Sequence, residues 1–233
     1  MNNLNIIFIH GWLFDSRIWN GLDKEFNKFK SVKLIDLPGY GINKKSKVSH
    51  NDFCRKVFNM VEDKTIIVAW SYGALLVLNA YHEIIASDVK IVLINANLDI
   101  QDPNNKELSI KNIDKLITNL RLDRNKTIKN FIYECVKHSN QSKKEFREII
   151  NKFKMIDFPS SEILIDNLNK MKLFSPNKHI PFKSDNILCI NTDKDQFVDR
   201  KNIAYHEIII SDLGHIPFIN GNKNIYKSII DFI

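Results

Sequence analysis

The segment Ile67-Val68-Ala69-Trp70-Ser71-Tyr72-Gly73-Ala74-Leu75 decides how the chain is interpreted. An apolar run leads into a serine that lies between two small residues, Ala69 and Gly73, and a second apolar run follows. This order predicts a buried strand, a tight turn and a helix, with the serine at the turn. A nucleophilic serine in such a turn needs small neighbours on both sides, because the turn is strained. An ordinary serine N-cap of a helix is the alternative.

Further apolar runs on both sides of this segment predict more strands, each rich in Ile, Val and Leu. They lie at Leu4–Ile9, Val32–Asp36, Thr65–Ala69, Lys90–Asn95, Ile187–Asn191 and His206–Ile210. Helix-like stretches alternate with them near residues 17–29, 50–62, 73–86 and 222–233. Continuous apolar strands that alternate with helices favour a mostly parallel sheet of about six strands, with helices on both faces.

The middle of the chain has a different pattern. Residues 98–183 lack a convincing strand, whereas Phe146, Ile149, Ile150 and Phe153 follow helical spacing. The sequence therefore predicts an α/β core formed by residues 1–97 and 184–233. A helical lid, or cap, is inserted at 98–183.

Composition excludes several classes of protein. The 233 residues are 44% hydrophobic and 26% charged, which rules out a disordered chain. No apolar run approaches the ~18 residues of a membrane helix, and residues 1–10 lack a signal-peptide pattern. Cys54, Cys135 and Cys189 are odd in number and widely spaced, which fits neither a disulfide framework nor a metal site. We expect a cytoplasmic protein without membrane association, metal or cofactor.

The net charge of +7 is concentrated in one window. Residues 106–154 hold 13 basic and 6 acidic side chains, so the rest of the chain is neutral as a whole. Two interpretations remain open: the predicted lid attracts an acidic partner, or it is a solvated surface in a Lys-rich chain. A nucleic-acid surface is disfavoured, because the window lacks dense Arg and interleaved aromatic residues.

A serine nucleophile requires a base and an acid that orients the base. His215, just after the last predicted strand, is the best candidate for the base. The acid should follow the strand at Ile187–Asn191, where Asp193 and Asp195 compete. Asp195 is favoured, since it lies deeper in the loop, whereas Asp193 is close enough to the strand end to form a turn.

The first strand ends in His10-Gly11-Trp12. A glycine at this point lets the backbone turn, so that the Trp12 N–H can face a bound carbonyl oxygen. Together with the Tyr72 N–H it would form a two-donor oxyanion hole. His10 itself is expected to be structural.

These motifs together resemble the α/β-hydrolase superfamily over nearly the whole chain. The segments that carry the resemblance are His10–Trp12, Asp36-Leu37-Pro38-Gly39-Tyr40-Gly41, Trp70–Gly73, Asp195 and Gly214-His215-Ile216-Pro217-Phe218. Within the superfamily they look most like the pimeloyl-acyl-carrier-protein methyl ester carboxylesterases of biotin synthesis. Two positions depart from the pattern: Ala69 replaces the first glycine of the turn, and Asn130 replaces a basic residue of the lid.

The resemblance implies a serine esterase that acts on the methyl ester of a carrier-bound pimeloyl chain, with Ser71 as nucleophile, His215 as base and Asp195 as acid. It also implies that Lys126, Lys143 and Arg147 contact an acidic carrier protein. We expect a monomer. The implied substrate-binding residues are Trp12, Trp70, Ser71, Tyr72, Phe131, Ile132, Tyr133, Glu134, Cys135 and His215. Remaining alternatives are a short-chain carboxylesterase or thioesterase, a menaquinone-pathway hydrolase, and a non-catalytic binding module on the same fold.

Overall fold

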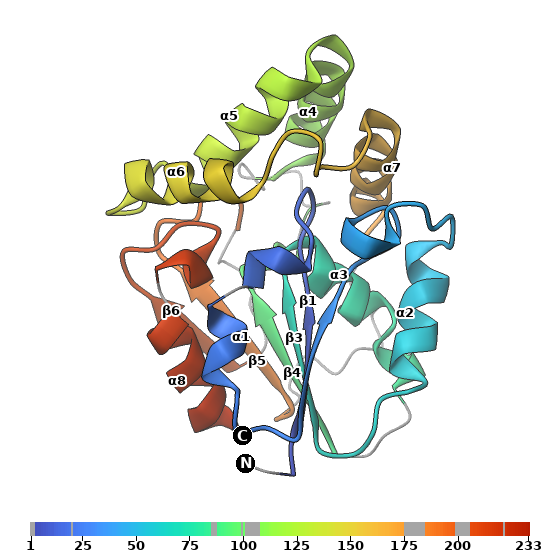
Figure 1. Cartoon of the computed structure of the whole chain (residues 1–233), viewed down its shortest axis with the longest axis vertical. Coiled ribbons are helices and arrows are strands. Elements are labelled where there is room, and N and C mark those ends of the chain that lie inside the picture. The colour runs from blue at the N-terminus through green and yellow to red at the C-terminus, as the bar shows by residue number, and fades with distance from the viewer. Residues whose placement is uncertain are drawn as a thin grey trace.

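A single parallel sheet forms the centre of the computed structural model (Figure 1). The structure describes residues 3–19, 21–84, 88–98, 100, 108–174, 185–198, 206–220 and 222–233. The strands are β1 (Asn5–Ile9), β2 (Ser31–Ile35), β3 (Thr65–Trp70), β4 (Val89–Ile94), β5 (Ile187–Thr192) and β6 (His206–Ile210). Their order is β2-β1-β3-β4-β5-β6, and every pair is parallel. The predicted mostly parallel sheet of about six strands is confirmed.

The central strands are apolar because they are covered on both faces. All residues of β1, β3 and β5 are buried. Helices α2 (His50–Phe58) and α3 (Tyr72–Asn79) cover one face of the sheet. Helices α1 (Leu22–Glu25) and α8 (Asn222–Phe232) pack together on the other (Figure 1). Continuous Ile and Val runs are the pattern expected for such doubly covered strands.

Three predicted helices of the core are shorter than expected. In the stretch 73–86, α3 ends at Asn79 and a separate 3-10 helix follows at Tyr81–Glu83. Among the described residues of the stretch 17–29, only the end of a 3-10 helix, Ser16–Trp19, and the four residues of α1 are helical, since Gly21 between them has φ +118°, which no right-handed helix accommodates. The stretch 50–62 is helical only to Phe58, after which consecutive tight turns lead the chain into β3.

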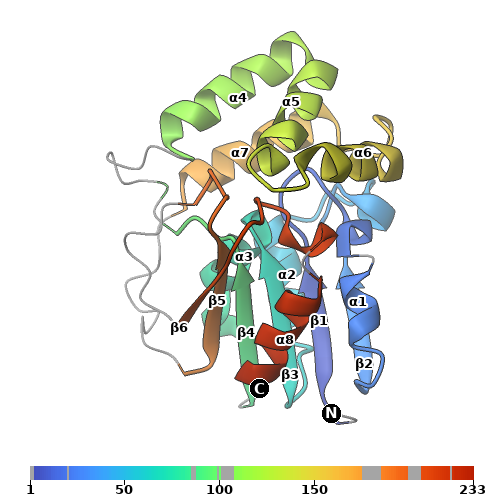
Figure 2. The ribbon, with the colours of Figure 1, turned by 90° about the vertical axis from the view of Figure 1, so that its left-hand side faces the viewer.

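In the described part of the chain, four helices lie between β4 and β5 in sequence and above the carboxyl ends of the strands (Figures 1 and 2). They are α4 (Ile110–Leu122), α5 (Arg124–Val136), α6 (Ser142–Lys152) and α7 (Ser161–Lys172), and they are called the cap below. Ser109, Asp123 and Ser160 cap α4, α5 and α7 by accepting a hydrogen bond from a backbone N–H of the first turn. The predicted boundary between residues 183 and 184 lies outside the described residues.

No helix in the described ranges is long and apolar enough to cross a membrane. The fold instead brings several loops together at one edge of the sheet. The loops after β1, β3, β4, β5 and β6 all leave the carboxyl ends of parallel strands and face the cap (Figure 2). A crevice at this edge is where open α/β sheets bind ligands.

Candidate active site

Ser71 occupies a strained turn between β3 and α3. Its backbone has φ +52° and ψ −120°, a conformation that non-glycine residues rarely adopt. The Ser71 N–H donates to the Ile94 carbonyl of β4 at 2.9 Å, and the Ser71 carbonyl accepts from Ala74 of α3. The Ser71 side chain makes no capping hydrogen bond, so it does not serve as a helix cap. The turn instead holds it above the edge of the sheet.

His215 links Ser71 to a carboxylate. Its Nε2 lies 3.0 Å from Ser71 Oγ, and its Nδ1 lies 2.7 Å from Asp195 Oδ2. The side chains of His215 and Asp195 are almost fully buried. The structure thus brings together the three residues that the sequence proposes as a triad, in the contact order that general-base activation of a serine requires.

Asp195, not Asp193, faces the histidine. The other oxygen of Asp195, Oδ1, accepts the Phe197 N–H at 2.7 Å, which fixes the carboxylate in its loop. Asp193 accepts the Asp212 N–H at 2.7 Å and lies 3.4 Å from the Lys194 ammonium. Asp193 therefore links the loop that follows β5 to the loop that follows β6.

Buried hydrogen bonds hold the His215 loop in place. The Trp70 indole N–H donates to the His215 carbonyl at 2.9 Å. Asn95, at the end of β4, donates to the carbonyls of Gly214 and His215 and accepts from the Thr192 N–H. Asn95 is fully buried with φ +46°. Sequence reasoning missed Asn95, although a polar residue directly after a buried strand was a visible signal.

The first strand and the serine turn are in close contact. A Cβ at Gly11 would lie 2.9 Å from the Trp70 ring, and a Cβ at Gly73 would lie 2.5 Å from the His10 carbonyl oxygen. Glycine is therefore required at both positions, where the end of β1 lies close to the turn that carries Ser71. The Trp12 indole N–H donates to Leu164 of α7 at 3.0 Å, so this side chain connects the β1 loop to the cap.

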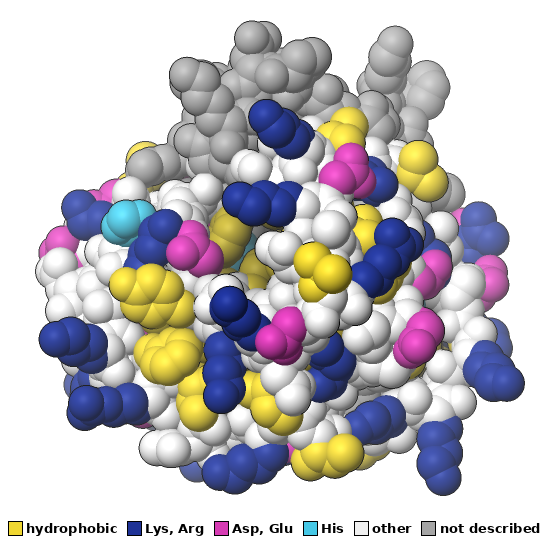
Figure 3. All heavy atoms as spheres, turned by 90° about the horizontal axis from the view of Figure 1, so that it is seen from above, with side chains coloured by type: hydrophobic (Ala, Val, Ile, Leu, Met, Phe, Trp, Pro, Cys, Tyr) yellow, Lys and Arg dark blue, Asp and Glu magenta, His cyan; other side chains and the backbone are white. Residues whose placement is uncertain are grey.

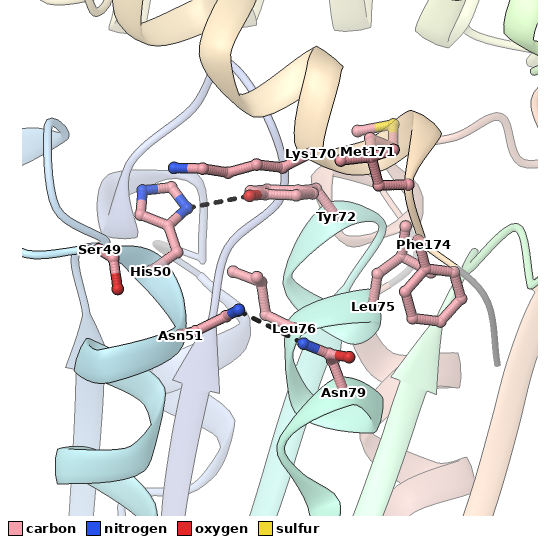
Figure 4. Close-up of a pocket in the computed structure, with 11 residues that line it drawn as sticks. Ser49, His50, Asn51, Tyr72, Leu75, Leu76, Asn79, Lys170, Met171 and Phe174 are labelled. Carbon is pink, nitrogen blue, oxygen red and sulfur yellow. Dashed lines mark hydrogen bonds between the residues drawn. The ribbon is translucent and has the colours of Figure 1, made fainter. Parts of the chain in front are cut away.

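Two buried histidines support the loops beneath the site. His10 accepts the Leu37 N–H at Nε2, and its Nδ1 lies 2.9 Å from the Gly11 carbonyl. His50 donates from Nε2 to the Pro38 carbonyl and accepts the Tyr72 hydroxyl at Nδ1, at 2.9 Å and 3.0 Å (Figure 4). Burial lowers the pKa of His10, and it lowers that of His50 to about 4, against the opposing effect of the Pro38 carbonyl. Both rings are thus neutral at pH 7, which fits a structural role for His10.

Helix α5 lies against the loops that follow β1, β5 and β6. Phe131 makes a T-shaped contact with Trp12 (ring centroids 4.8 Å) and stacks on Phe197 (5.4 Å), whose ring is 5.0 Å from His215. The Cys135 carbonyl accepts the His215 N–H at 2.8 Å. A cavity of about 430 Å³ opens beside these rings, between α4, α5 and the loop after β5, and Phe131, Glu134 and Phe197 are part of its lining.

The remaining residues implied as substrate contacts lie in several environments. Ile132 and Trp70 are buried among other core side chains, and Cys135 is buried as well. Tyr133 is 52% exposed and packs against Phe146. Glu134 accepts from the Gln196 amide at 2.6 Å and pairs with Lys137, so it ties α5 to the residue that follows Asp195.

The basic residues of the cap are exposed and mixed with acids. Lys126 lies in the first turn of α5, and Lys143 and Arg147 lie on α6, all three exposed. Figure 3, which looks down on this end of the molecule, shows Lys and Arg side chains over most of the face with Asp and Glu between them. Arg124 is different, because its guanidinium donates to the carbonyls of Met155, Phe158 and Pro159 and thereby stabilises the cap internally.

Residues 6–128 match the model of the alpha/beta hydrolase family, a stretch that makes up more than half of the chain. The chain belongs to the alpha/beta hydrolase family. The resemblance stated from the sequence motifs is therefore confirmed at this level. The match begins in β1 and ends in α5 of this hydrolase, so it includes the turn that carries Ser71.

Comparison with individual proteins agrees with this assignment. The hydrolase is 25% identical over 238 residues to a pimeloyl-[acyl-carrier protein] methyl ester esterase from Wigglesworthia glossinidia brevipalpis, covering 94% of this chain and 89% of the relative. An esterase from Exiguobacterium antarcticum superposes with a TM-score of 0.80 at 16% identity, covering 100% of this chain and 92% of the other. A bromoperoxidase from Bacillus anthracis gives the same TM-score at 14% identity, covering 99% and 91%. Both solved structures share the fold of this hydrolase.

Proposed function

We propose that this hydrolase is a serine carboxylesterase that cleaves the methyl ester of a pimeloyl chain carried by acyl carrier protein. The contact chain from Ser71 Oγ through His215 to Asp195 is the observation that carries the proposal. The named esterase relative, similar over almost its whole length, supports the substrate class. The enzyme would act as a cytoplasmic monomer and need no cofactor.

In the first half of the reaction, His215 Nε2 removes the Ser71 hydroxyl proton as Oγ attacks the ester carbonyl carbon. Asp195 orients the imidazole and stabilises its positive charge. The oxyanion that forms is bound by the N–H groups of Trp12 and Tyr72, each contributing roughly 3–4 kcal/mol to the transition state. His215 then returns the proton to the methoxy oxygen, and methanol leaves.

In the second half, water attacks the acyl-enzyme. His215 now takes a proton from the water, and the same two N–H groups stabilise the second tetrahedral intermediate. Its collapse releases the free carboxylate of the acyl chain and returns the proton to Ser71. Burial of the Asp195 and His215 side chains supports this role, because charge interactions are stronger where water is excluded.

The surroundings of the triad support an acyl substrate on an acidic carrier. The rings of Phe131 and Phe197 form an apolar wall next to His215, and the 430 Å³ cavity beside them can receive a chain. Lys126, Lys143 and Arg147 are exposed on the cap nearby. Positive charge here would raise the rate of encounter with an acidic carrier protein.

A small-molecule ester or thioester hydrolase is the second candidate. It is favoured by the ion pairs Lys137–Glu134 and Lys144–Glu148, which neutralise part of the positive charge of the cap. In that case the 430 Å³ cavity alone would define the substrate.

The deciding experiment compares hydrolysis of methyl pimeloyl carrier protein with that of free methyl esters of varied chain length. We expect kcat/KM to be highest for the carrier-bound ester and to fall with added salt, while the free esters respond little to salt. Equal kcat/KM values for carrier-bound and free methyl pimelate would instead support the small-molecule candidate. Rescue of a biotin-requiring strain by the wild-type chain, but not by Ser71→Ala, gives an independent check.

A further inference from the structure

A second cavity, of about 260 Å³, lies between α2, α3 and α7 (Figure 4), and none of its lining residues lines the 430 Å³ cavity of the cap. Its apolar walls are Leu75 and Leu76 of α3 together with Met171 and Phe174 at the end of α7. The Tyr72 ring, fixed by its bond to His50, closes one side. This space is large enough and apolar enough to enclose part of a small ligand.

The cavity continues into an open basic groove. Ser49, His50 and Lys170 line both the cavity and a groove of about 610 Å³ between the segment before α2 and helix α7. The charged residues along this groove are Lys44, Lys45, Lys47, Lys170 and Asp166. Lysines therefore outnumber the acid by three, and Lys170 lines both the cavity and the groove.

The hydrogen bonds and ion pairs of these side chains leave a net positive charge in the groove. The Lys170 ammonium lies 2.5 Å from Asp166, which neutralises one of the four lysines. Lys44 donates to the Ile156 carbonyl, a contact that orients its ammonium without neutralising it. Lys45 and Lys47 are exposed. His50, neutral at pH 7, adds no charge, so the lysines alone define the electrostatic character.

The cavity lies outside the proposed acyl site. Among the described residues that line it, Tyr72 alone adjoins the catalytic serine, and neither Ser71, Asp195 nor His215 is included. The Tyr72 hydroxyl points to His50 on α2 (Figure 4). A ligand in the cavity would therefore contact no side chain of the triad.

We propose that this cavity and groove form a binding site for an amphiphilic carboxylate of medium chain length. The alkyl chain lies against Leu75, Leu76 and Met171. The carboxylate is bound by Lys170, whose ammonium it shares with Asp166, with support from the exposed Lys45 and Lys47 of the groove. The inference needs no esterase activity, because it concerns binding alone. Burial of methylene groups supplies the affinity and the lysines select for the anion.

Titration calorimetry with octanoate, octanamide and acetate tests the site in the whole chain. We expect octanoate to bind at least tenfold more tightly than acetate, because acetate has no chain to bury. Octanamide should bind more weakly than octanoate, since it carries no charge. Lys170→Gln should weaken octanoate about three- to fivefold and leave octanamide unchanged. Lys172→Gln is the matched control, because Lys172 lies on the same helix, pairs with Asp114 and does not line the cavity.

A second variant tests the apolar half. Asn79 lines the cavity from an exposed position on α3, so Asn79→Trp should narrow the entrance without disturbing the core. Both octanoate and octanamide should then bind at least tenfold more weakly, while the melting temperature stays the same. The proposal is overturned if octanoate does not bind the wild type, if octanamide binds as tightly, or if either Lys170→Gln or Asn79→Trp leaves octanoate affinity unchanged.

Discussion

The loops at the strand ends and the surface of the cap are built on different principles. Around Ser71 and His215, polar groups are buried and each is held by short hydrogen bonds, as Asn95 and Trp70 show. On the cap, Lys126, Lys143 and Arg147 are exposed to solvent. Buried polar groups tolerate little displacement, because an unsatisfied bond costs about 1–3 kcal/mol, whereas exposed charges contribute little to stability. The buried groups around Ser71 and His215 can therefore fix a reaction geometry. Substitutions on the cap surface can change the partner that binds with little loss of stability.

The largest expected effect comes from Ser71→Ala at the strand ends. Removal of the nucleophile should lower kcat for a p-nitrophenyl ester by roughly 10⁶-fold, while the circular dichroism spectrum and melting temperature stay near the wild-type values. Steady-state kinetics and a thermal melt check both parts. Turnover that survives this substitution would remove the proposed mechanism and leave only a binding role for the fold.

The choice between the two aspartates is tested next. Asp195→Asn should reduce kcat up to ~10⁴-fold, because the amide favours the wrong tautomer of His215. Asp193→Asn is the matched control and should keep most activity, since Asp193 bonds the Asp212 N–H rather than the histidine. If Asp193→Asn is the more damaging of the two, Asp195 is not the triad acid.

The free energy of unfolding, measured as a function of pH, distinguishes the contribution of a buried titratable group from that of exposed charges. The pKa of His50 is about 4 in the folded state, below the ordinary value of 6.5, because burial disfavours the charged ring. The unfolded chain therefore binds the proton first as the pH falls, and the contribution of neutral His50 to stability is lost between about pH 6.5 and pH 4. The loss amounts to roughly 3 kcal/mol.

Urea unfolding at pH 7 and pH 4.5 measures this effect. The wild type should lose more stability on acidification than His50→Gln, which cannot take up a proton at this position. Charge reversal at the exposed Lys143 should leave the difference between the two pH values unchanged. Equal acid sensitivity of wild type and His50→Gln would show that other groups dominate the acid response.

The smallest effect is expected on the cap. Reversing Lys126, Lys143 and Arg147 to Glu should lower kcat/KM for the carrier-bound ester about tenfold at low salt, by slowing encounter. Hydrolysis of a p-nitrophenyl ester should stay unchanged, because the triad is not touched. The control is the replacement by Glu of three lysines outside the cap, Lys24, Lys28 and Lys223. Equal losses on both substrates would argue against a docking surface.

Local features of the chain were predictable to a large extent. The six predicted strands agree with β1–β6 to within a residue or so at each end, because runs of Ile and Val leave a strong signal, most clearly in the fully buried strands β1, β3 and β5. Helix lengths were predicted less well near Gly21, Phe58 and Asn79, where tight turns or a short 3-10 helix replaced the expected α-helix.

The candidate site was predictable as a set of residue types in a fixed order. The sequence proposed Ser71, Asp195 and His215, and all three are in contact in the structure. It could not predict the role of Asn95, whose partners lie about 100 or more positions away in the chain. Nor could it show that Glu134 binds Gln196, because this contact depends on how α5 is placed above the sheet.

The sequence by itself determined the strand-turn-helix around Ser71, the alternation that builds a parallel sheet, and the helical, basic insertion. Each of these follows from neighbours within one element, where periodicity and residue size act directly. Only the tertiary structure decided which aspartate faces His215, which buried amide and indole hold its loop, and where a second cavity opens beneath α7. Those outcomes depend on strand register and helix packing, which bring together residues that no local pattern connects.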